Sequence, residues 1–80
     1  MKGIKLSHGT IFITDGLITV RVLASGQVGV SPVTYNTLEW ELQSENPNGW
    51  DYLTAGEIES LEKYQEILLV FENTRKLLKI

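Results

Sequence analysis

The dipeptide Asp15-Gly16 is the feature that most restricts how this chain can fold. It stands between two strand-like runs. In residues 11–14 two isoleucines alternate with Phe12 and Thr14, and in residues 17–23 Ile18, Val20 and Val22 alternate with polar residues. An Asp-Gly pair between alternating runs is typical of a two-residue type I′ hairpin turn, whose central residues need positive φ angles. Alternation with a period of two turns one side of each strand toward a core. The sequence therefore predicts an antiparallel β-hairpin in this region.

The strand pattern continues beyond the hairpin. Ser25-Gly26 predicts a second turn, and Val28 and Val30 keep the alternation. Pro32 follows, and because proline has no backbone N–H to donate, it marks an edge, a bulge or the end of a strand. A third strand is expected to end near this residue.

Residues 37–43 fit a strand and a helix in different ways. Alternation would place Leu38, Trp40 and Leu42 on the core face of a strand and the intervening glutamates in solvent. In the competing interpretation a helix begins at Ser31-Pro32, and Leu38 and Leu42 lie one turn apart. The Val, Thr and Tyr residues between Pro32 and Leu38 favour the strand. We therefore predict a further strand here.

The last third of the chain has a helical pattern. Residues 44–53 are rich in Asn, Pro and Gly and predict a loop. Thr54 and Glu57 have the spacing of a capping box, in which the threonine hydroxyl and the glutamate carboxylate accept backbone N–H groups of the first turn. Beyond them, residues at spacings of three and four are apolar, and two acid–base pairs are four apart. These are Ile58, Leu61, Tyr64, Leu68 and Phe71, with the pairs Glu59–Lys63 and Glu72–Lys76.

Together these patterns predict one α+β domain over residues 1–80. A β-meander of three to four antiparallel strands, about residues 3–43, would pack on one C-terminal α-helix, about residues 55–78, with the loop 44–53 between them. A chain of 80 residues buries only about 60–65% of its unfolded surface, so its core is thin and its stability is expected to be marginal.

The run from Ile67 to Phe71 is apolar all round the predicted helix, which one sheet face cannot cover. One expectation is an interface between copies of the chain, formed by Ile67, Leu69 and Val70. The alternatives are that strand ends and the 44–53 loop cover this turn, or that the run is itself a fifth strand.

Catalytic and metal-binding patterns are missing from the sequence. It contains no cysteine and a single histidine, His8, which excludes disulfides, thiolate nucleophiles and a metal site with several histidines in one chain. No P-loop, GxSxG or HExxH pattern occurs. We therefore expect no enzyme, no cofactor and no metal. The lack of cysteine favours a reducing, cytoplasmic setting, and no apolar run is long enough to span a membrane.

The middle of the chain is acidic. Residues 37–66 carry eight acidic side chains and one lysine, in a protein whose formal net charge is −3. Such a band repels phosphates, so direct nucleic-acid binding is not expected. One interpretation is a solvated acidic face, and the other is a docking face for a partner protein with a basic surface.

The segment with Trp50, Asp51 and Tyr52 is a candidate recognition loop, because tryptophan and tyrosine dominate binding hot spots. Its alternative role is structural, with Trp50 folded back on the core. The candidate partner-binding residues combine this loop with the acidic band: Glu39, Glu41, Trp50, Asp51, Tyr52, Glu59 and Glu62.

These observations favour a non-enzymatic protein–protein interaction module. In size and charge alone, the chain resembles the small inhibitors that phages and mobile elements make against host defences. The alternative is a homo-oligomer that binds a small molecule or nucleotide in a pocket between subunits, near residues 67–71 and lined by Trp40, Trp50 or Tyr52. An enzyme that uses carboxylates alone is a third hypothesis.

Overall fold

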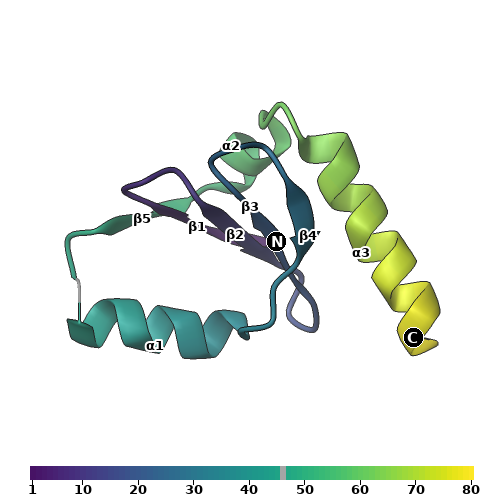
Figure 1. Cartoon of the computed structure of the whole chain (residues 1–80), viewed down its shortest axis with the longest axis horizontal. Helices are drawn as coiled ribbons and strands as arrows, with labels where there is room; N and C mark the ends of the chain where they lie inside the picture. The colour runs from purple at the N-terminus through teal and green to yellow at the C-terminus, as the bar shows by residue number, and fades with distance from the viewer. Residues whose placement is uncertain (46) are drawn as a thin grey trace.

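The computed structural model describes residues 1–45 and 47–80 and is drawn in Figure 1. Its strands form one antiparallel sheet in the order β4-β3-β2-β1-β5, so the first strand lies between the second and the fifth. The C-terminal helix packs on this sheet, which confirms the α+β class. The elements are β1 (Lys2–Leu6), β2 (Ile11–Thr14), β3 (Thr19–Val22), β4 (Val28–Val30), α1 (Tyr35–Glu45), β5 (Trp50–Leu53), α2 (Ala55–Glu59) and α3 (Tyr64–Leu78).

The hairpin between β2 and β3 is present, but its turn is not type I′. The backbone N–H of Asp15 donates to the Ile18 carbonyl at 3.2 Å, so Gly16 and Leu17 are the central residues. Gly16 has a φ of +101°, which glycine adopts without steric cost. The Asp15 carboxylate accepts the N–H groups of Leu17 and Ile18 at 3.0 and 2.8 Å. The aspartate therefore stabilises the turn from its first position.

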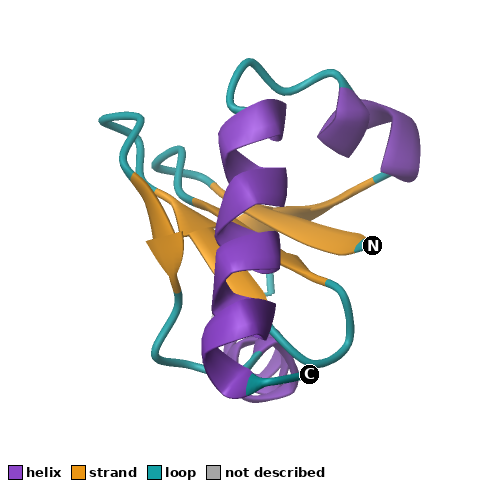
Figure 2. Ribbon diagram, turned by 90° about the vertical axis from the view of Figure 1, so that its right-hand side faces the viewer, coloured by secondary structure: helices purple, strands orange, loops and turns teal. Residues whose placement is uncertain are grey.

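The main core lies between the sheet and the two C-terminal helices. Alternate residues of β2 and β3 turn toward α3, which crosses the sheet in Figure 2. The helices contribute Ile58, Ile67 and Phe71, all buried. Burial of this apolar surface is the main stabilising term of the fold. The strands contribute Ile11, Ile13, Val20 and Val22.

The opposite face of the sheet is covered by α1. Phe12 and Thr14 alternate with the core residues of β2 and are also buried. Ile4 is paired with Phe12 across the sheet, and Tyr35 closes this side from the first turn of α1. The sheet is thus covered on both faces, although the sequence pattern predicted one solvent-facing side.

The prediction of a strand at residues 37–43 is wrong, because these residues lie within α1. Thr34 caps the helix, since its hydroxyl accepts the N–H of Thr37 at 3.3 Å and its carbonyl accepts that of Leu38 at 3.0 Å. Leu38 and Leu42, one turn apart, lie on the same side as buried Tyr35. The cap and this spacing outweigh the β-propensity of the segment.

The predicted loop 44–53 contains a strand. Residues Trp50 to Leu53 form β5, which pairs with β1 from Gly3–Leu53 to Leu6–Trp50. Aromatic and apolar residues with a period of two favour a strand, but the preceding Asn, Pro and Gly masked this signal.

The predicted helix 55–78 is two helices. The capping box at Thr54 and Glu57 is confirmed, with bonds of 3.1 and 3.0 Å. Ile58 of α2 packs on β1 near Gly3, whereas α3 lies along β3 and β4. A straight helix cannot reach both ends of the sheet, so the chain turns between them. The turn removes the expected Glu59–Lys63 pair.

Two ion pairs lie along α3, the helix that follows this turn. Lys63 pairs with Glu66 at 3.4 Å instead of with Glu59. The predicted pair of Glu72 and Lys76 is present at 3.2 Å. Both pairs are largely exposed to solvent, so each contributes little to stability.

The apolar run at 67–71 is largely covered within one chain. Ile67 and Phe71 are buried, and Val70 packs partly against the core. Ile67, which is predicted to contribute to an interface between copies, is enclosed by its own chain. Leu69 is the exposed member of the run, at 54%. No helix in the described ranges has the length and apolar character needed to cross a membrane.

Candidate partner-binding surface

The helix α1 is acidic and carries no basic side chain. Its charged residues are Glu39, Glu41 and Glu45, and the last two are exposed. Glutamate near the C-terminal end of a helix opposes the helix dipole. The intrinsic stability of α1 is therefore low, and its cap and its contacts with the sheet hold it in place.

A polar network ties α1 to β5. The hydroxyl of Tyr52 donates to the Glu39 carboxylate, and the Gln43 amide donates to the same hydroxyl at 3.3 Å. The Tyr52 ring meets the Trp50 ring edge to face, with centroids 4.7 Å apart. The hydrogen bond to Glu39 raises the pKa of Tyr52, because it holds the phenolic proton. This network fixes how β5 and the middle of α1 lie relative to each other.

Tyr35 lies beneath this network and is almost fully enclosed. Its side chain is 4% exposed, and its hydroxyl has no hydrogen-bond partner among the described residues. Burial, together with the negative charge of Glu39 and the neighbouring Tyr52, raises the pKa of Tyr35 to about 12. The phenol is therefore neutral at physiological pH and serves as packing.

Trp40 lies on the outer side of α1. It is 69% exposed, whereas Tyr35, five residues earlier, faces the sheet. The residues one turn away from it along the helix are uncharged, and one of them, Gln43, donates a hydrogen bond to the Tyr52 hydroxyl. The strand prediction placed Trp40 in the core. The helical alternative could have placed it correctly, since Trp40 falls opposite Leu38 and Leu42 on a helical period.

The structure brings three of the predicted partner-binding residues together. Glu39, Trp50 and Tyr52 lie on the α1 side of the sheet. Asp51, also on β5, points to the other side, where it is opposite Lys5 across the strand pair. Glu41 is exposed on α1. The remaining two, Glu59 and Glu62, are exposed at α2 and the turn after it.

The seven predicted residues therefore do not share one face. The helices α1 and α2 lie on opposite sides of the sheet in Figure 1, which separates Glu59 and Glu62 from Glu39. Residues 67–71 likewise lie on the opposite side from Trp40 and Tyr52. A pocket lined by both groups cannot form within a single chain.

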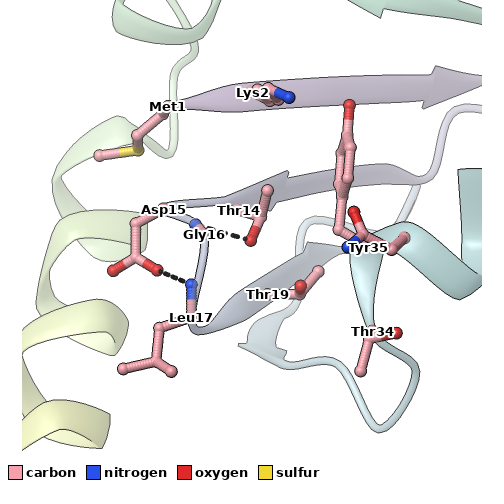
Figure 3. Close-up of a pocket in the computed structure, with 10 residues that line it drawn as sticks. Met1, Lys2, Thr14, Asp15, Gly16, Leu17, Thr19, Thr34 and Tyr35 are labelled. Carbon is pink, nitrogen blue, oxygen red and sulfur yellow. Dashed lines mark hydrogen bonds between the residues drawn. The ribbon is translucent and has the colours of Figure 1, made fainter.

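A separate cavity of about 700 Å³ lies under the first turn of α1, beside the β2–β3 turn (Figure 3). Many of its polar groups are already bonded within the chain. The Thr14 hydroxyl donates to the Ile18 carbonyl at 2.9 Å and accepts the Gly16 N–H at 3.1 Å. Asp15 holds the turn and also pairs with Arg75 of α3. These groups therefore serve the fold, and this leaves them little capacity to recognise a ligand.

Asp15 links the β2–β3 turn to α3, and this link should depend on pH. Burial opposes its charge, but N–H groups of Ile18 and Leu17 and the Arg75 guanidinium outweigh burial, so the pKa of Asp15 is lowered. A lowered pKa stabilises the fold above about pH 4, and that contribution is lost as pH falls through the folded-state pKa.

We expect Asp15→Asn to lower the unfolding free energy by about 1–2 kcal/mol at neutral pH. The difference from the wild type should shrink below about pH 3. Urea unfolding of the wild type and the variant, at neutral pH and below about pH 3, measures this difference in unfolding free energy. An equal difference at both pH values would contradict the assigned role of the charge.

Among the described residues, no group of three or more His, Asp or Glu side chains could hold a metal ion. Comparison of the chain with protein-family models, with curated proteins and with solved structures finds no significant match.

Proposed function

We propose that the protein is a non-enzymatic binding module that docks on a partner protein through the outer side of α1 and the adjoining side of β5. We define this α1–β5 surface by Glu39, Trp40, Glu41, Gln43 and Tyr52. The observation that carries the proposal is the exposure of Trp40 in the middle of a helix. Large aromatic side chains are costly to leave in water and are enriched at the centres of protein interfaces.

The charge of the surface supports a partner with a basic face. Glu41, which follows Trp40 directly, and Glu45, further along the helix, are both exposed, and α1 offers no lysine or arginine to neutralise them. An acidic rim around an aromatic centre attracts a basic protein surface and makes association faster at low salt. The same rim repels the phosphates of nucleic acids.

The proposal is tested with Trp40→Ala. Tagged wild-type and variant proteins are produced in the native cells, and the bound proteins are quantified. We expect a partner with a basic surface to be depleted at least about tenfold by the variant, since a central tryptophan contributes about 2 kcal/mol or more to binding. Because Trp40 is exposed, the unfolding free energy should change by less than about 0.5 kcal/mol.

The matched control is Leu77→Ala, which removes another exposed apolar side chain, from α3. It should retain the partner. Titration of the purified partner should then show that Glu41→Lys slows association and weakens its dependence on salt. If Trp40→Ala and Leu77→Ala retain the same proteins in the same amounts, the α1–β5 surface is not the docking site.

A further inference from the structure

The strand β5 forms one edge of the sheet, and its outer side pairs with no strand among the described residues. The other edge, β4, lies against α3. An open edge presents unpaired backbone groups that can bind another strand. The edge formed by β5 is therefore a place where a further strand can be added.

The register shows which backbone groups point outward. The N–H of Ser7 donates to the Gly49 carbonyl at 2.9 Å, and Lys5 is paired with Asp51. In an antiparallel ladder, hydrogen-bonded pairs alternate with non-bonded pairs. The backbone groups of Asp51 and Leu53 therefore bond to β1, whereas those of Trp50 and Tyr52 point away from it.

The side chains beside this edge are mainly acidic. On one face of the sheet, the Glu39 carboxylate accepts a hydrogen bond from the Tyr52 hydroxyl. On the other face Asp51 is exposed, and Glu57 at the start of α2 follows shortly after β5. Lys5 is the cation opposite Asp51. A segment that pairs with β5 would therefore be favoured by lysine or arginine side chains on both of its faces.

We propose that the open edge of β5 binds an extended, lysine- or arginine-rich segment of the partner protein, which adds to the sheet as a sixth strand. This inference rests on the proposed function, because it takes the basic partner from there. Backbone hydrogen bonds would give affinity, and the flanking carboxylates would favour a positively charged segment. A second copy fits less well, since pairing β5 with β5 brings the Asp51 side chains and the Glu39 carboxylates of two chains toward each other.

The test uses an acetylated and amidated eight-residue peptide, Lys-Lys-Val-Val-Lys-Lys-Val-Val, which places lysines on both faces of an extended strand. Amide hydrogen exchange of the full chain is followed by NMR with and without the peptide. We expect exchange at Trp50 and Tyr52 to slow by about tenfold or more at saturation, while Asp51 and Leu53, already bonded to β1, change little. This alternation is specific to strand addition.

Three controls separate backbone pairing from charge. A peptide N-methylated at the amides that face β5 should bind about tenfold more weakly, because it loses those hydrogen bonds. A peptide with glutamate in place of lysine should not bind. Asp51→Lys should weaken binding of the lysine peptide more than Glu62→Lys, which changes the net charge equally in the turn after α2.

Several results would overturn strand addition. These are no binding at about millimolar peptide, equal affinity of the N-methylated peptide, or binding without slower exchange at Trp50 and Tyr52. Slow exchange of these two amides in concentrated protein alone would assign the edge to a second copy. None of these results affects the Trp40→Ala experiment. That experiment alters the outer side of α1 and tests the proposed function separately.

Discussion

Replacing Ile67 with alanine is expected to lower the free energy of unfolding by about 3 kcal/mol. Ile67 has no exposed surface and lies at the centre of the core between α3 and the sheet. Truncation removes buried methyl and methylene groups and leaves a cavity that close-packed neighbours fill only in part. For a domain of this length, such a loss is a large part of the total stability.

The matched control is Leu69→Ala, two residues along the same helix. Leu69 is exposed, so its truncation should cost less than about 0.5 kcal/mol. Urea unfolding followed by circular dichroism measures both variants. A loss at Leu69 that is as large as the loss at Ile67, and that grows with protein concentration, would show that a second copy covers α3. It would thereby support the interface expected from the apolar run.

Stability is expected to fall steeply in alkali because of Tyr35. Its pKa is about 12 in the folded protein, against about 10 in an unfolded chain. Below pH 10 both states keep the proton, and the full stabilisation is present. Between about pH 10 and 12 the unfolded state loses the proton first, so the unfolding free energy falls by about 2–3 kcal/mol over this range. Urea unfolding at about pH 8 and 11.5 checks this.

The control variant is Tyr35→Phe, which keeps the ring and removes the ionisable group. Since the hydroxyl is buried without a partner, its removal should leave stability at neutral pH unchanged or raise it by about 1 kcal/mol. The alkaline slope should become shallower, and the difference from the wild type isolates Tyr35 from the other tyrosines and the lysines. An unchanged slope would contradict the burial of this phenol.

Local signals predicted the parts of the fold that are held by short-range contacts. Asp15-Gly16 marks a turn because glycine accepts a positive φ there, even though the turn type differs from the expected one. Thr54 and Glu57 mark a helix start because the bonds of a capping box lie within four residues. The expected pairing of a sheet with a C-terminal helix followed from these signals and from the apolar periodicity.

The elements that were missed depend on distant contacts. The segment 50–53 becomes a strand because β1 offers an edge to it, and no local pattern records that edge. The break after Glu59 arises because α2 and α3 cover different ends of the sheet. The site was affected in the same way. Trp50, Tyr52 and Glu39 meet only when α1 lies across the sheet, and Trp40 is exposed because its segment forms a helix, which its β-propensity disfavours.

The position of β1 between β2 and β5 has a consequence for the order in which the protein can be built. Its outer partner is β5. Gly3 therefore cannot pair until Leu53, about fifty residues later in the chain, has been synthesised. As the chain leaves the ribosome, the first four strands can pair with near neighbours, while β1 remains an unprotected edge. The edge moves to β5 only when the last part of the sheet has been made. A nascent chain and the finished protein therefore present different strands to the cell.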